Sequence, residues 1–174
     1  MKKKSGATVN ERPLFQNACY AIPLRERLSV HFRRLVFLPS LALRYRLRRF
    51  LPTNLMRPGD VVRVYIRDYE APRILQILGI RDRDATAAVK VATYLHNITH
   101  PLGEITEMTV TKSVRMERHC PYARFLKPEI CRDLVSGPAF QGLCEAIHPD
   151  LVHLHTKYLS GGDEYCDLTF ELKS

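Results

Sequence analysis

Apolar residues near the N-terminus recur at the spacing of a helix. Between Leu24 and Phe50 they fall three or four residues apart, and Pro39 divides this segment into two short helices. The stretch that follows, "LPTNLMRPGD", contains prolines and a glycine. The pattern therefore predicts a pair of N-terminal helices followed by a linker.

The segment after the linker has two patterns. Its first part, "VVRVYIRDY", alternates as a strand does, whereas "PRILQILG" has helical spacing and ends at Gly79, a residue typical of helix ends. A clearer helix follows, because Asp82 or Asp84 can cap a run that reaches about Ile98 with apolar residues on one stripe. The first segment stays open between strand and helix, and the second is predicted to be a helix.

The C-terminal half combines strands with short helices. One long strand is predicted from Ile105 to Arg118, and two alternating runs around the turn "SGGDE" predict an antiparallel hairpin at the end. Between them, helices are predicted at residues 122–126, 128–135 and 138–147. This order of elements indicates an α+β fold, an antiparallel sheet with helices on one face, together with the basic N-terminal helices.

Charge divides the chain into two parts. Residues 1–57 contain 13 Lys and Arg against 2 Asp and Glu, a net charge of +11, whereas residues 58–174 contain 14 against 16, a net charge of −2. We therefore predict a basic helical segment at 1–57 and a ligand-binding or catalytic α+β domain at 58–174.

The basic helices have three interpretations. They could pack on their own domain or on a second copy in a homodimer, bind nucleic acid, or lie on a membrane surface. The chain has no tryptophan and no recognised nucleic-acid-binding motif. Packing or homodimerisation is therefore favoured, and nucleic acid is the less favoured partner.

Composition and cysteine usage indicate a cytoplasmic protein. The longest apolar run near the N-terminus, "LVFLPSLAL", is about half the length that crosses a bilayer. "MKKK" is followed by polar residues rather than by the apolar core of a signal peptide. We expect no membrane span. The five cysteines are expected to be reduced, and their spacings match no zinc motif.

Cys120 is the cysteine whose context points to chemistry. Pro121 favours an extended residue before it and suits the first position of a helix, so Cys120 would cap the helix that begins "PYARF". The helix dipole and nearby basic residues would then lower the pKa of the thiol. The alternative is a cysteine at the end of a strand that only packs.

Arg118 is predicted to face the interior with Cys120. Residues of the same parity along the predicted strand are mostly apolar, namely Met108, Val110, Val114 and Met116. An inward arginine needs a negative partner, because an unpaired buried charge is very costly. That partner would be a protein carboxylate, or a ligand carboxylate held by two hydrogen bonds.

The other cysteines and histidines of this half have ordinary interpretations beside the functional ones. Cys131 and Cys144 lie on apolar helical stripes, and Cys166 shares a strand face with apolar residues, so core packing is favoured for all three. His153 and His155 stand two apart on a predicted strand. They could share a metal, one could serve Cys120 as a base, or both could lie on a solvated face. The sequence leaves metal and cofactor content open.

Three stretches carry a resemblance to a known family: "HCPYARFLKPEIC", "GPAFQGLCEAIHPDL" and "YLSGGDEYCDLTFEL". They resemble the L-2-amino-thiazoline-4-carboxylic acid hydrolase family, many of whose members are bacterial. In that family a Cys-Pro pair follows a strand, cysteines lie on the next helices, and a GD-x-x-C hairpin closes the domain. The matching positions lie within residues 103–174 and are Cys120, Pro121, Cys131, Cys144, Gly162, Asp163 and Cys166. A similar closing hairpin occurs in vinyl-reductase-type hydrocarbon-binding domains, which resemble sensor modules.

The resemblance implies hydrolysis of a small, carboxylate-bearing cyclic amidine or amide, in which water opens the ring. On this hypothesis the catalytic candidates are Cys120, which attacks the ring or orients water, and the proton carriers His153, His155 and Asp163. The substrate-binding candidates are Arg118, which would hold the carboxylate, together with Tyr122, Cys131 and Cys166. A turn aspartate such as Asp163 commonly serves only the turn. The alternative function is a non-catalytic domain that binds a small molecule or a metal.

Overall fold

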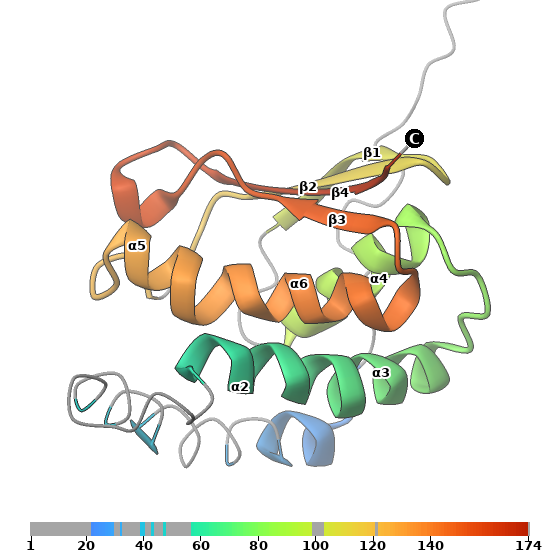
Figure 1. Ribbon diagram of the computed structural model, residues 1–174, viewed down its shortest axis with the longest axis horizontal. Coiled ribbons are helices and arrows are strands. Elements are labelled where there is room, and N and C mark those ends of the chain that lie inside the picture. Colours follow the sequence, from blue (N-terminus) through green and yellow to red (C-terminus); the bar gives the residue numbers. More distant parts are fainter. Residues whose placement is uncertain are drawn as a thin grey trace, which may run out of the picture.

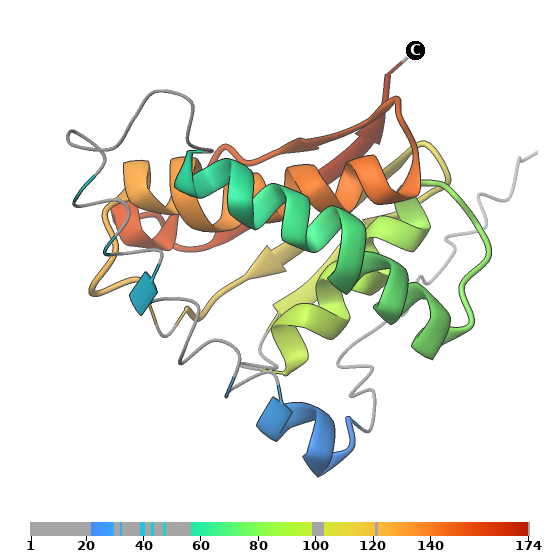
Figure 2. The same cartoon turned by 60° about the horizontal axis from the view of Figure 1, so that its bottom comes forward.

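The fold is a four-stranded antiparallel sheet with helices packed on one of its faces (Figure 1). The computed structural model describes residues 22–29, 32, 39, 40, 43, 47, 57–98, 103–120 and 122–173. Helices α4 (Ala85–Asn97) and α6 (Ser136–Ile147) lie against the sheet. A longer helical stretch covers these two helices on the side away from the sheet (Figure 2). The structure confirms the predicted α+β class with helices on one face of the sheet.

The strands lie in the order β1, β2, β4, β3 across the sheet. The first antiparallel hairpin consists of β1 (Gly103–Met108) and β2 (Lys112–Glu117). The second consists of β3 (Leu151–Leu154) and β4 (Cys166–Leu172), and β2 pairs with β4 in the middle of the sheet. The predicted closing hairpin is confirmed.

The single long strand predicted from Ile105 to Arg118 is wrong, because the chain reverses at residues 109–111. This turn contains neither glycine nor proline, and Thr109 holds it instead. The backbone N–H of Thr109 donates to the carbonyl of Lys112 at 2.8 Å, and its Oγ1 accepts the N–H of Lys112 at 2.9 Å. A hydroxyl side chain therefore supplies the turn that glycine or proline usually signals.

The segment that was open between strand and helix is helical throughout. It consists of α2 (Pro58–Tyr65), the π-helical turn η1 (Ile66–Glu70) and α3 (Ala71–Leu78). Ile74 is buried in the main core and Val62 in a second cluster with Leu134, and burial of one side of the segment favours the helix over the strand. The stretch ends at Gly79, whose φ of 63° is the left-handed conformation expected after a helix.

The other helices follow their sequence signals to different extents. Asp84 caps α4 as predicted, since its Oδ1 accepts the backbone N–H of Ala87 at 2.9 Å. The helix predicted at residues 122–126 is only a turn over 122–125. The next segment forms α5 (Pro128–Ile130) and the π-helical turn η2 (Cys131–Val135) directly before α6.

The described N-terminal segment is anchored to the domain through Ile22 and Glu26. Residues 24–29 form a short helix, Ile22 is 6% exposed and belongs to the main core, and Glu26 pairs with Arg73 of α3. Most of the remaining residues of 1–57, Cys19 among them, lie outside the described residues, as does Pro121. Among the described helices, none is long and apolar enough to cross a bilayer.

Candidate functional site

The inner face of β2 is polar although the helices cover it. Ser113, Arg115 and Glu117 point into the interior and are 0%, 1% and 2% exposed. Arg115 is therefore the buried arginine of this strand. Its Nε donates to Oε1 of Glu117, so the pair carries its own counter-charge, as a buried ion must.

The predicted inward position of Arg118 is wrong. Its side chain is 59% exposed and pairs with Glu104 at 3.0 Å. The prediction assigned the apolar parity of Val114 and Met116 to the interior, but these residues are half-buried on the outer face. The buried face of the strand is instead the one with Arg115 and Glu117, because these two charges neutralise each other.

Helix α4 completes the polar cluster above β2. Nη1 of Arg115 donates to Oγ1 of Thr93 at 3.0 Å, and Nδ1 of His96 contacts Oε1 of Glu117. Burial by itself would raise the pKa of Glu117, but neighbouring His96 and Arg115 outweigh it and hold that pKa below its usual value. We call Thr93, His96, Arg115 and Glu117 the inner-face polar cluster.

Gly103 of β1 leaves room for this cluster. It pairs with Glu117 across the β1–β2 ladder, and a Cβ at its position would overlap Nη2 of Arg115 and the carboxyl group of Glu117. The two charged side chains therefore lie directly over a backbone position that carries no side chain. On the other side of β2, Glu117 is opposite Cys166 of β4.

Several buried polar atoms on this face have no hydrogen-bond partner among the described residues. They are Nη2 of Arg115, Oε2 of Glu117, Nε2 of His153 and both ring nitrogens of His155, although the backbone of Lys157 approaches the His155 ring. Each such atom costs roughly 1–3 kcal/mol when it stays unpaired. Donors and acceptors without partners thus gather on one side of the sheet.

The histidine pair faces this interior rather than solvent. The ring of His153 lies 5.0 Å from Phe140 of α6 and 5.4 Å from Phe170 of β4, between ring centroids. His155, just after β3, stacks on Tyr158 at 3.8 Å, whereas Leu154 between them is 45% exposed. The interpretation of a solvated histidine face is therefore wrong.

Burial keeps both imidazoles neutral. With burial as the largest cause, the pKa of His153 is lowered to about 3 and that of His155 to about 4; a neighbouring histidine acts in the same direction on each, and Asp167 opposes it. An imidazole with so low a pKa binds a proton weakly and makes a poor general base near neutral pH. Asp167 fixes the chain beside the pair, because it accepts the backbone N–H groups of Thr156 at 2.8 Å and Lys157 at 2.6 Å.

Three half-buried thiols lie at the end of the inner face where β2 stops. They belong to Cys120, Cys131 and Cys166, and they are close enough for a charge on one to raise the pKa of another. Sγ of Cys131 lies 3.2 Å from Oγ of Ser136, and Sγ of Cys166 accepts the backbone N–H of Leu159 at 3.2 Å. Cys131 and Cys166 are only half-buried, which differs from the core packing favoured for them. Cys144 is fully buried as expected.

The predicted low pKa of Cys120 is wrong. Burial raises the pKa of its thiol, and this outweighs the backbone N–H groups of Tyr122 and Ala123, which bond to the sulfur and lower it. The capping hypothesis predicted that backbone N–H groups at the start of a helix would bond to the sulfur. Such N–H groups are present, but they belong to a turn rather than to a helix. Burial raises the pKa of Cys166 to about 12 and that of Cys144 still further.

Two other candidates have local structural partners. Asp163 is exposed, and its Oδ2 accepts the backbone N–H of Tyr158 at 2.7 Å, which is the turn interpretation of that residue. Tyr122 is half-buried, and its carbonyl accepts the N–H groups of Phe125 and Leu126. Within the described parts of the chain, no group of three His, Cys, Asp or Glu side chains is arranged to hold a metal.

The structure brings some predicted residues together and adds others. His153, His155, Cys120, Cys131 and Cys166 all lie along the inner face or at its end. Arg118 and Asp163 are both exposed. The residues missed are Thr93, His96, Arg115 and Glu117. The sequence signal that could have identified them was a cation and an anion, Arg115 and Glu117, that alternate on one face of a strand.

No family model matches this chain, and comparisons with curated proteins and with solved structures found no match either.

Proposed function

We propose that the protein binds a small polar molecule with a carboxylate on the inner face of its sheet. The observation that carries the proposal is a pair of buried atoms, Nη2 of Arg115 and Oε2 of Glu117, that have no hydrogen-bond partner among the described residues, in residues that are 1% and 2% exposed. A guanidinium N–H is a strong donor to a carboxylate. Oε2 of Glu117 can accept an N–H from the same ligand.

The surroundings fit a ligand with an apolar body and polar ends. Phe140 and Phe170 pack beside His153, whose neutral Nε2 is also without a partner among the described residues. Three half-buried residues, Cys120, Cys166 and His155, lie near the inner-face polar cluster. Apolar walls with a few converging polar groups are typical of small-molecule sites.

The experiment compares two conservative variants in a binding titration. L-2-Amino-thiazoline-4-carboxylate serves as the probe, because it carries both a carboxylate and an amidine. Arg115→Lys keeps a positive charge beside Glu117 but removes Nη2, so we expect affinity to fall about tenfold or more. Arg118→Lys, a change to an exposed arginine, is the control and should bind as the parent does. Equal affinity of the Arg115 variant and the parent would contradict the proposed site.

A second candidate function is hydrolysis of such a cyclic amidine, and the contacts of Cys120 favour it. Backbone N–H groups of Tyr122 and Ala123 already reach its sulfur and stabilise a thiolate. Burial raises the pKa of this thiol, and a cationic ligand beside it would lower that pKa again. Mass spectrometry of the probe after incubation would show the gain of one water, and Cys120→Ser should abolish it. Binding without this mass gain leaves the protein as a binding domain.

A further inference from the structure

The basic N-terminal segment presents an apolar stripe to solvent. Leu24, Leu28 and Phe32 are 71%, 60% and 71% exposed, and their spacing of four residues puts them on one side of a helix. The anchoring contacts use other positions, because Ile22 enters the core and Glu26 pairs with Arg73. One side of this described helical turn therefore contacts α3, and its large apolar side chains are exposed to solvent.

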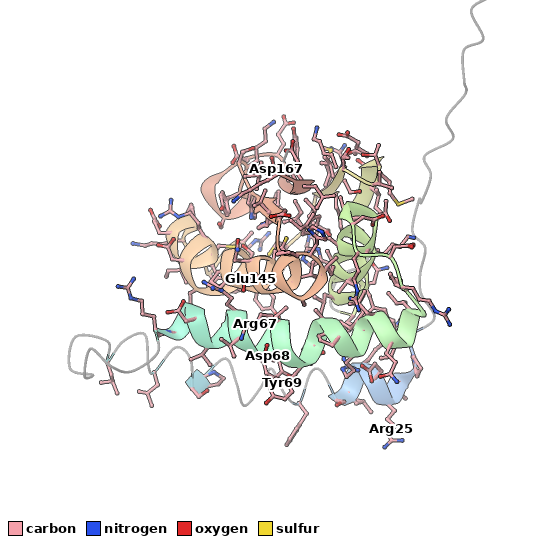
Figure 3. The ribbon with its side chains drawn as sticks, turned by 45° about the vertical axis from the view of Figure 1, so that its right-hand side comes forward. Arg25, Arg67, Asp68, Tyr69, Glu145 and Asp167 are labelled. Atoms are coloured by element: carbon pink, nitrogen blue, oxygen red, sulfur yellow. The ribbon has the colours of Figure 1, made fainter. Side chains whose placement is uncertain are left out.

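The same arrangement recurs further along the segment. Leu43 and Leu47 are both helical, again four residues apart, and they are 58% and 41% exposed. Tyr69 of η1 is 67% exposed, and Figure 3 shows it pointing away from the sheet on the side where Arg25 of the short helix also points outward. Tyr69 thus adds an exposed aromatic ring on the side of the molecule away from the sheet.

Positive charge accompanies these apolar side chains. Arg25 and Arg27 are exposed beside Leu24 and Leu28. Residues 1–57 as a whole carry 13 Lys and Arg against 2 Asp and Glu, whereas the rest of the chain has a net charge of −2. A partner that fits this segment must offer negative charge and cover apolar side chains as well.

We propose that this segment docks on an anionic phospholipid surface, with Leu24, Leu28 and Phe32 inserted at the level of the headgroups. Basic amphipathic helices bind membranes in this way, through apolar burial and attraction to anionic lipids. Nucleic acid would satisfy the arginines but leave the apolar stripe uncovered. A second copy of the chain would cover the stripe but bring two segments of +11 together.

The test measures how much of the full-length chain sediments with lipid vesicles. Vesicles of phosphatidylcholine alone are compared with vesicles of equal parts phosphatidylcholine and phosphatidylglycerol. We expect strong binding to the anionic vesicles only. The double variant Leu24→Ser with Leu28→Ser should lose about tenfold or more in partition. Because both side chains are exposed, these changes should leave thermal unfolding unchanged.

The control variant is Ile77→Ser with Val110→Ser, which removes exposed apolar side chains outside residues 1–57 and should keep full binding. Three results would overturn the proposal. One is equal binding to neutral and anionic vesicles, or none to either. Another is salt-sensitive binding to duplex DNA that the leucine variant leaves intact, which would assign the segment to nucleic acid. The third is a dimer in light scattering that the leucine variant dissociates.

Discussion

Arg115 and Glu117 make one part of an otherwise apolar interior polar. Both are almost fully buried, and each satisfies part of the other while keeping one polar atom unpaired among the described residues. Replacing such a pair by apolar residues is often neutral or stabilising for a fold. We therefore propose that ligand binding, rather than stability, is the reason for the pair.

The buried histidines make stability depend on pH. His153 and His155 have folded pKa values of about 3 and 4, below the value of about 6.5 in an unfolded chain. The unfolded state thus binds more protons between these values. Their contribution to the free energy of unfolding is complete above about pH 6.5. It falls as the pH drops toward 4, by up to about 1.4 kcal/mol per pH unit for each histidine.

Urea unfolding at pH 7 and pH 5 measures this dependence. The variant His155→Gln should lose less stability than the parent between the two values. The exposed His119 provides the matched control, since His119→Gln should keep the parent's pH dependence. A His155→Gln protein with the same loss as the parent would show that this imidazole is not buried in its neutral form.

Cysteine reactivity follows from burial in the same way. Because burial raises the pKa of Cys120, labelling by iodoacetamide should be slow at pH 7 and should accelerate only above the ordinary thiol value of about 8.5. Cys144 should react only after unfolding. Mass spectrometry cysteine by cysteine on the folded protein provides the readout. Fast labelling of Cys120 alone at neutral pH would instead support the nucleophile hypothesis.

At the scale of elements, local signals predicted the helices better than they predicted the strands. The Asp84 cap and Gly79 end were readable because each acts within a few residues of the chain. The reversal at Thr109 was missed because a hydroxyl replaces the usual turn residues. The parity of β2 was misread because a strand with Val114 and Met116 on one face and a compensating ion pair on the other can bury either face.

The close approach of α2 and α6 can be tested through Gly142. A Cβ at this position would overlap the backbone carbonyl of Arg63 in α2. Gly142→Ala should therefore destabilise the protein by about 1–3 kcal/mol, although alanine favours an isolated helix. Chemical denaturation of this variant and of the neighbouring Gln141→Ala gives the comparison. A stabilised Gly142→Ala protein would contradict the packing of the two helices.

At the scale of the whole molecule, the sheet has one face covered by helices, and that face holds the candidate site. Composition and pattern were enough for the α+β class and for the division of charge at residue 57. The site itself depends on long-range contacts, in which α4 places Thr93 and His96 over β2 and the closing hairpin places His153 nearby. The spacing of residues along the sequence does not predict such contacts between distant elements.

The most direct measurement is a calorimetric titration of the full chain with L-2-amino-thiazoline-4-carboxylate and, separately, with its carboxamide. The carboxamide keeps the ring and the amidine but cannot form the charged hydrogen bond to Nη2 of Arg115. The proposed site predicts saturable binding of the carboxylate and at least about tenfold weaker binding of the carboxamide. Equal affinity for both compounds, or no binding of the carboxylate, would contradict it.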